Sequence, residues 1–349
     1  MIRKSIFVVA GLLVAGLVFA QAPAPAPAGP APTGLIVGSG NFFSPIVADL
    51  DKAVAFYRDG LGLEVQGAPA NAEANAPLRN MFGLPDAQLR WSIGRPAGMR
   101  TGVEIVEISK AGGRPAERRL QDSGSFSLIV LVRDLDAVFG RLTQLGTPVV
   151  TKGGKPIAVP SGSRARAVIV KDPDGHFVEL YQPDPLPAAT ATPAPNVIEV
   201  RVRLAVNDVD QATRLYVDQL GMATRTPGKF EGNPAVLDMM GLPSGAQYRA
   251  SMFTVPTTGL VFELIDFKGV DRRMVKSNLQ DPGSTRIQLQ VRDVDAVIAA
   301  VKAAGGSVQS TGGTTVDLPA RGGSIKVAIV RDPDNLFLVL LQTAAPPRP

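Results

Sequence analysis

The chain has 349 residues, of which 45% are hydrophobic and 19% charged, enough apolar sequence for about two folded domains. Its formal net charge of +5 is spread without a long basic block, so we expect no nucleic-acid partner. There is no cysteine and a single histidine, His176. These counts exclude disulfides, thiolate metal sites and any site within one chain that needs two imidazoles.

The first 20 residues have the pattern of a secretory signal peptide. Basic Arg3 and Lys4 precede an apolar run from Ile6 to Phe19, which is followed by Ala20 at a plausible cleavage point. The run is shorter than the roughly 20 residues of a membrane span, so we expect no stable membrane anchor after cleavage. The predicted location is secreted, or periplasmic if the source is a Gram-negative bacterium.

Composition divides the rest of the chain into two similar halves. Residues 21–37 form an Ala/Pro-rich linker, and residues 184–195 form a second linker rich in Pro, Ala and Thr. The sequence therefore predicts folded domains over residues 38–183 and 196–342, followed by a short tail over residues 343–349.

A Val-x-Asp-(Leu/Val)-Asp motif occurs four times, twice in each half. The first aspartate of each copy stands between an alternating strand pattern and a helical pattern, where a helix N-cap belongs. Several short strand patterns follow each helix, so each copy predicts a strand–helix–strand–strand–strand module and the fold class is α+β. The four predicted N-caps are Asp49, Asp134, Asp208 and Asp293.

Each half closes with an Asp-Pro-Asp turn that leads into an apolar strand. The copies are Asp172–Gln182 and Asp332–Gln342. The first strand places Glu179 on the same face as Phe177 and Tyr181, whereas the second has Val339 at the matching position. Glu179 is a candidate general base or metal ligand, and it could equally be an inherited carboxylate bonded to neighbouring strands.

The segment Val47–Leu63 resembles the first strand and helix of the vicinal oxygen chelate superfamily, and Asp172–Gln182 is similar to its closing strand. That superfamily includes glyoxalase I, fosfomycin and bleomycin resistance proteins, and extradiol dioxygenases. The resemblance covers both halves and implies two tandem domains, each a pair of βαβββ modules whose mixed sheet forms a cup. In metal-dependent members the cup holds a divalent cation. The fold supports many reactions, so the resemblance defines the fold better than the chemistry.

The resemblance also assigns four metal-ligand positions to each half. None of the eight residues is a histidine, and His176 matches a turn histidine that is usually not a ligand. The resemblance therefore implies no cofactor, although Glu104 and Glu179 with waters could hold a divalent metal such as Mg, Mn, Zn or Fe. The assigned positions are Phe42, Glu104, Ser127 and Glu179 in the first half, and Arg201, Glu263, Arg286 and Val339 in the second.

We expect an exported glyoxalase-like protein that binds a small organic ligand, with an anion as one option, in a cup without the usual His-based metal site. The alternative is a metal-dependent or acid–base enzyme, of the glyoxalase or dioxygenase type, with Glu104 and Glu179 as catalytic residues. A purely structural module is a third interpretation, and the sequence leaves the oligomeric state open. Arg201, Arg286 and Glu263 predict either an anion-binding cup or an internal salt-bridge cluster. The candidate ligand-binding residues are Phe42, Ser127, Arg201, Glu263 and Arg286.

Overall fold

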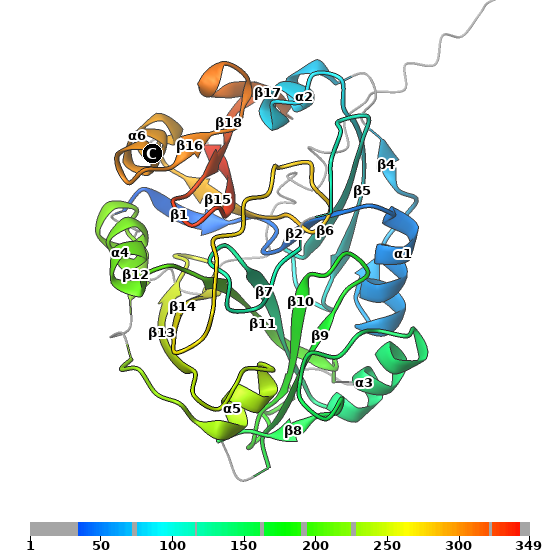
Figure 1. Ribbon diagram of the computed structural model, residues 1–349. Coiled ribbons are helices and arrows are strands. Elements are labelled where there is room, and N and C mark those ends of the chain that lie inside the picture. The colour runs from blue at the N-terminus through cyan, green and yellow to red at the C-terminus, as the bar shows by residue number, and fades with distance from the viewer. Residues whose placement is uncertain are drawn as a thin grey trace, which may run out of the picture.

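The computed structural model describes residues 34–71, 75–115, 117–160, 164–189, 194–224, 228–320 and 323–342. The predicted signal peptide, most of the first linker and the C-terminal tail lie outside the described residues. The chain forms two curled mixed sheets, one above the other in Figure 1, with short helices around them. No described helix is long and apolar enough to cross a membrane.

The first sheet combines strands from the beginning and the end of the chain. Its strand order is β16-β18-β19-β15-β2-β6-β5-β3, and β1, β4 and β17 attach to it. Strand β1 includes residues 36 and 37, which the sequence placed in a linker. The N-terminal strands are β1 (Ile36–Ser39), β2 (Ser44–Val47), β3 (Glu64–Val65), β4 (Ala70–Asn71), β5 (Gln88–Arg95) and β6 (Val103–Ser109). The C-terminal strands are β15 (Thr285–Val291), β16 (Ser307–Val308), β17 (Val316–Ala320), β18 (Gly323–Arg331) and β19 (Phe337–Gln342).

The second sheet combines strands from the middle of the chain, in the order β12-β13-β14-β11-β7-β10-β9-β8. At its centre β7 and β11 pair antiparallel, with Ser127 opposite Arg203. The strands are β7 (Phe126–Val132), β8 (Ile157–Ala158), β9 (Arg166–Lys171), β10 (Phe177–Gln182), β11 (Val197–Ala205), β12 (Ala223–Thr224), β13 (Gln247–Thr254) and β14 (Val261–Lys268).

Each sheet is a pair of βαβββ modules, as expected, but the two modules of a pair come from different halves of the chain. The first sheet joins β2–β6 to β15–β19, and the second joins β7–β10 to β11–β14. Residues 38–183 and 196–342 therefore each supply one module to each sheet. This pairing decides which candidate site residues can meet.

The four predicted N-caps are confirmed. Asp49, Asp134, Asp208 and Asp293 each precede a helix, and each carboxylate accepts a hydrogen bond from an amide of the first turn. The helices are α1 (Leu50–Ala55), extended by a π-helical turn Phe56–Gly60; α3 (Leu135–Gln144); α4 (Val209–Thr213), extended by a π-helical turn Arg214–Gln219; and α6 (Val294–Ala303).

Two further helices fill the inner faces of the sheets. Helix α2 (Ala76–Phe82) packs against β17 and β18, and its Leu78 and Phe82 belong to the same apolar cluster as Phe337 and Val339 of β19. Helix α5 (Pro234–Met239) packs Leu237 against a cluster that includes Phe177 of β10. A short 3₁₀ turn, Thr311–Gly313, follows β16. Much of each predicted cup is therefore solid apolar core.

The two Asp-Pro-Asp turns have the same backbone geometry. Asp172 accepts hydrogen bonds from the amides of Asp174 and His176, at 3.0 and 2.9 Å. Asp332 accepts from the amides two and four residues on, at 3.0 and 2.8 Å. Each carboxylate also accepts a tyrosine hydroxyl, from Tyr57 at 2.9 Å and from Tyr216 at 2.6 Å respectively. The first aspartate of each turn thus organises the chain before the closing strand.

The turns differ in one side chain. His176 Nδ1 lies 2.8 Å from Asp172 Oδ2, and its Nε2 lies 3.0 Å from the carbonyl oxygen of Ser284. Both ring nitrogens face acceptors, so the bonding is complete only when both carry a proton. Leu336 occupies the matching position in the second turn and offers Asp332 no such partner.

This difference moves the two carboxyl pKa values in opposite directions. Burial alone would raise the pKa of Asp172, but the charge and hydrogen bonds of His176 outweigh it and lower that pKa. Burial, with the nearby charge of Asp334, raises the pKa of Asp332 to about 7. Asp332 is therefore a buried carboxyl whose ionisation opposes folding at neutral pH.

We predict that Asp332→Asn stabilises the protein at pH 8 by roughly 1–3 kcal/mol. Between pH 4 and 7 the folded carboxyl binds a proton that the unfolded chain releases, so wild-type stability falls as pH rises through this window. The advantage of the variant should therefore grow from pH 4 to pH 7 and then level off, measured by urea unfolding.

Asp172→Asn is the matched control. The lowered pKa of Asp172 contributes stability above the unfolded pKa, and that stability is lost as pH falls through the folded pKa. This variant should be destabilised at neutral pH, with the loss shrinking in acid. Equal pH profiles for the two variants would contradict the assignment.

Candidate functional site

Glu104 of β6 lies in a closed polar cluster of the first sheet. Its Oε2 accepts hydrogen bonds from Gln288 Nε2 at 2.9 Å and Arg286 Nη2 at 3.2 Å, both on β15, and from Ser44 Oγ of β2 at 3.4 Å. Glu104 is 3% exposed and Arg286 is 1% exposed. The Arg286 guanidinium also lies 4.8 Å from the ring centre of Phe82 on α2. The carboxylate is therefore neutralised and sealed beneath that helix.

Arg203 of β11 occupies the corresponding place in the second sheet. Its Nη1 donates to Glu179 of β10 at 2.6 Å, and its Nε donates to Glu263 of β14 at 2.7 Å. Burial alone would lower the pKa of Arg203, but the two carboxylates outweigh it and raise that pKa. One guanidinium thus bridges the carboxylates of strands on either side of β7 and β11.

Arg201 is separate from this bridge although it precedes it by two residues. Its Nε and Nη2 bind the carboxylate of Glu199 on the same strand, at 2.7 and 3.2 Å. The Arg201 side chain is 33% exposed, so this pair lies at the rim of the cup. Ser127 is buried on β7 and lies opposite Arg203 in the sheet register.

The structure corrects the expected grouping of site residues. Glu104 and Glu179 lie in different sheets and cannot act as one carboxylate pair. Arg286 pairs with Glu104 and not with Glu263. Phe42 is buried in the apolar core and makes no part of the polar cluster around Glu104. Arg286 and Glu263 both form internal salt bridges, as the salt-bridge alternative predicted. They do not pair with each other, however, because Arg286 binds Glu104 and Glu263 binds Arg203.

Sequence reasoning missed Ser44, Arg203 and Gln288. Ser44 and Arg203 lie two residues after Phe42 and Arg201, so the resemblance placed each of these positions one strand repeat too far from the helix cap. Alternation puts residues two apart on the same face and could not separate these choices. The charge of Arg203 on the cup-facing side of β11 was the signal that could have identified it.

The residues of these clusters do not fit a metal ion. Among the described residues, no group of three or more His, Cys, Asp or Glu side chains could hold one. Glu179 and Glu263 converge, but the Arg203 guanidinium lies between them and supplies the positive charge. Glu104 faces an arginine and an amide donor in the same way. Fixed cations of the chain thus compete directly with metal binding.

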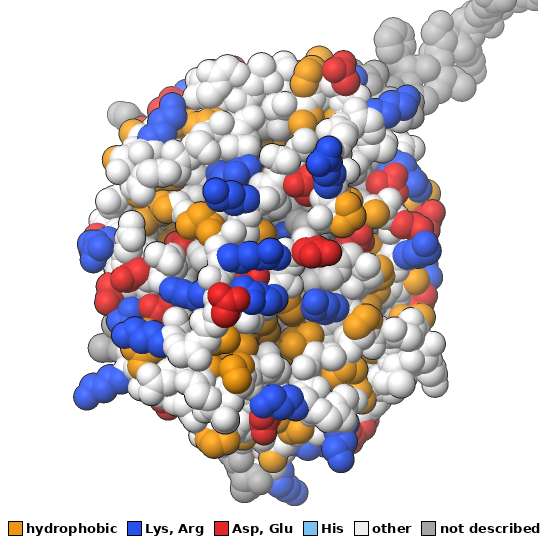
Figure 2. Space-filling view, viewed as in Figure 1, with side chains coloured by type: hydrophobic (Ala, Val, Ile, Leu, Met, Phe, Trp, Pro, Cys, Tyr) orange, Lys and Arg blue, Asp and Glu red, His pale blue; other side chains and the backbone are white. Residues whose placement is uncertain are grey.

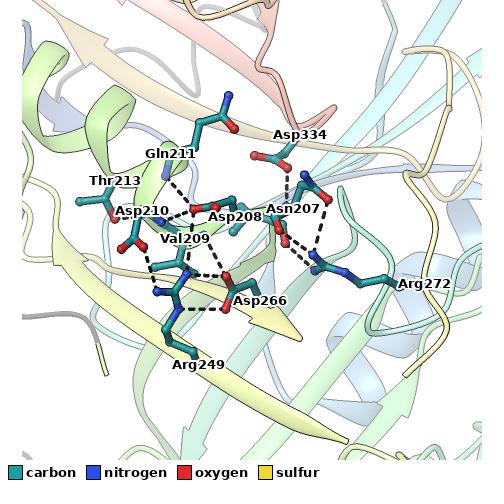
Figure 3. Close-up of polar contacts among 11 residues, drawn as sticks. Asn207, Asp208, Val209, Asp210, Gln211, Thr213, Arg249, Asp266, Arg272 and Asp334 are labelled. Atoms are coloured by element: carbon teal, nitrogen blue, oxygen red, sulfur yellow. Dashed lines mark hydrogen bonds and ion pairs between the residues drawn. The ribbon is translucent and has the colours of Figure 1, made fainter. Parts of the chain in front are cut away.

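A second polar network, drawn in Figure 3, has a structural role. Arg249 of β13 donates to Asp266 at 2.8 Å and to Asp210 of α4 at 2.9 Å. Asp266 in turn accepts the amide of Val209, the first residue of α4. The network fastens the N-terminus of α4 to β13 and β14, and its polar groups satisfy one another.

The paired βαβββ modules, curled into two cups, define the class of this protein as a two-domain cupped-sheet fold. A family model described as the Glyoxalase/Bleomycin resistance protein/Dioxygenase superfamily matches residues 41–180 and 199–340. The chain belongs to this superfamily. No curated protein sequence matches it significantly.

Solved structures agree with the fold. Glyoxalase I from Zea mays is 19% identical with a TM-score of 0.55, and the alignment covers 86% of this chain and 92% of that one. A mutant of the same enzyme gives 18% identity and a TM-score of 0.56 over 86% and 93%. A presumed dioxygenase from Bacillus subtilis gives 14% identity and a TM-score of 0.50 over 90% and 87%. At these identities the likeness establishes the fold alone.

We predict that Arg203→Met destabilises the protein by roughly 3–5 kcal/mol, because it leaves two buried carboxylates without a cation. Adding Glu179→Gln and Glu263→Gln should recover most of the loss. Arg201→Met, which breaks only the half-exposed pair at the rim, should cost about 1 kcal/mol or less. Urea unfolding measures all three, and equal costs for the two arginine variants would contradict the assigned roles.

Proposed function

We propose that this chain is an exported, metal-independent member of the superfamily that binds a small organic ligand at the cup of its second sheet. The observation that carries the proposal is the Arg203 bridge between Glu179 and Glu263. A guanidinium fixed between these carboxylates supplies the charge that a bound cation would otherwise provide. Export is the part of the proposal that rests on residues 1–20 alone.

The second sheet is favoured over the first because its polar groups reach solvent. In the first sheet Glu104, Arg286 and Gln288 are all buried. In the second, Arg201 is one-third exposed at the rim, two residues from the buried bridge. A ligand with a carboxylate or phosphate group could displace Glu199 and take both hydrogen bonds of the Arg201 guanidinium.

Catalysis by Glu104 and Glu179 has little support in the geometry. A general base must lie within hydrogen-bond reach of the substrate proton. Glu179 is 4% exposed and bound to Arg203 at 2.6 Å, and Glu104 is 3% exposed and accepts from Arg286, Gln288 and Ser44. We therefore place the function in ligand binding rather than proton transfer.

The purified protein should contain well under one metal ion per chain by elemental analysis, and EDTA should leave its Tm unchanged. Arg203→Met should gain a Tm increase with Mn²⁺ or Mg²⁺, because it frees two converging carboxylates for a hard cation. Arg286→Met is the matched control, since it frees only Glu104. About one metal per wild-type chain, lost in a Glu179→Gln/Glu263→Gln variant, would overturn the proposal.

The ligand site itself is tested with a panel of small organic acids at constant ionic strength. Arg201→Ala should weaken binding of a wild-type ligand about tenfold or more, because a charge-assisted bidentate contact is lost. Glu199→Gln should strengthen binding, since it removes the internal competitor for Arg201. The proposal fails if calorimetry finds the same affinities in all three proteins.

A further inference from the structure

A cavity of about 500 Å³ lies outside both cups, where the connection from β6 to β7 meets the turn between β9 and β10. We call it the junction pocket. Figure 2 shows Lys and Arg side chains gathered, with acidic side chains among them, across the middle of one face of the protein. The pocket is lined by Pro115, Glu117, Arg118, Arg119, Lys171, Asp174, Gly175 and Arg273.

Arg118 is the unusual residue of the junction pocket. It is only 7% exposed, yet its Nε and Nη2 atoms are buried without a hydrogen-bond partner. It forms no ion pair with any residue that the structure describes. A buried guanidinium without an acceptor is costly, so this side chain suits a partner that the described part of the chain does not supply.

The two carboxylates that attract Arg118 are already engaged. Asp172 and Asp281 attract Arg118 electrostatically, but burial outweighs them and lowers the pKa of Arg118 to about 10. Asp172 accepts from Tyr57, His176 and two amides. Asp281 accepts from the amides of Arg114 and Asn278, at 2.9 and 2.6 Å. At neutral pH Arg118 therefore keeps its charge while lacking a contact ion.

The orphan atoms have a specific geometry. Nε and Nη2 form the edge of a guanidinium that donates two parallel hydrogen bonds to one carboxylate or phosphate group. Elsewhere in this chain that edge binds a carboxylate, as in Arg58 with Asp59, Arg201 with Glu199 and Arg249 with Asp266. In Arg118 the same edge has no acceptor. Arg118 lines the junction pocket, so an acceptor bound there lies beside this side chain.

The surrounding charges favour an anion. Arg119 is held in place by Asp122 and Asp271, both at 2.8 Å, and Arg273 lies 3.6 Å from Asp122. The Lys171 ammonium lies 5.1 Å from the ring centre of Phe177. Glu117 and Asp174 oppose Arg118 and these three cations, and burial raises the pKa of Asp174. The wall of the pocket carries more positive than negative groups.

The internal repeat supplies a comparison position. A Leu-Gln-Asp run occupies residues 120–122 and again residues 279–281, which aligns Arg118 with Ser277. The same connection is thus made in the second half with a small neutral residue. Arg118 is not required to form this connection, which removes the simplest structural reason for burying its charge.

We propose that the junction pocket binds an oxyanion, the phosphate or carboxylate group of a small molecule, through the Nε and Nη2 edge of Arg118. Lys171, which also lines the pocket, contributes a second positive charge. The site is separate from the rim of the second cup, and it does not depend on a ligand binding there.

Binding is measured by calorimetry and by Tm shifts with inorganic phosphate and with succinate, against KCl at equal ionic strength. At least one of the two anions should raise the wild-type Tm, and which one does so distinguishes phosphate from carboxylate recognition. Arg118→Ser and Arg118→Met should weaken that binding tenfold or more. Both variants should keep or exceed the wild-type Tm in KCl, because they remove a buried unpaired charge.

Two controls separate this site from general electrostatics and from the cup. Arg58→Met removes an exposed arginine elsewhere and should leave the anion response intact. Arg201→Ala alters the rim of the cup and should also leave it intact. The proposal is overturned if neither anion exceeds KCl, if the Arg118 variants respond as wild type, or if Arg201→Ala abolishes the response.

Discussion

Neutralisation of buried charge by fixed arginines is the constraint on which both cups depend. Removing carboxylates and guanidinium groups from water costs several kcal/mol each, so each must find a well-placed partner. Arg203 joins β10, β11 and β14, and Arg286 joins β15 to β6. Both arrangements therefore cross the seam where a module from one half of the chain meets a module from the other. Breaking either pair would loosen the contact between modules as well as expose a charge.

These ion pairs also explain why the cups can be filled. Once the carboxylates are satisfied from within the sheet, apolar groups can cover them, and among the described residues Arg286 Nε is the atom of this cluster left buried without a partner. Phe82 of α2 stacks on Arg286, and the apolar residues of α5 pack beside β10. The interior is then closed to solvent in the first sheet, and accessible polar groups are found at the rim of the second and at the junction pocket.

Local features of the fold were predictable from the sequence, whereas pairing between modules was not. The four aspartate caps and the turns at Asp172 and Asp332 depend on residues close in sequence, and all are present. Module pairing depends on contacts between repeats that are far apart in the sequence. The four repeats have nearly the same hydrophobic pattern, so this pattern does not show which two modules share a sheet. The sequence assigned the bridging position to Arg201, two residues before Arg203. Side chains two residues apart on a strand share a face, so the alternation could not distinguish these two arginines.

The two halves of the chain have diverged in charge around the same turn. In the first half His176 engages Asp172 and also reaches the carbonyl of Ser284 before β15. With Asp172 occupied in this way, Arg118 keeps a positive charge that no contact with a described residue neutralises. In the second half Leu336 and Ser277 stand at the matching positions, and Asp332 is left with a raised pKa. One copy of the turn region thus has a surplus cation and the other a surplus carboxyl. The two turns have the same backbone hydrogen bonds, so this asymmetry lies in their side chains. The first copy, which carries the unpaired guanidinium of Arg118, is therefore the one suited to bind an external anion.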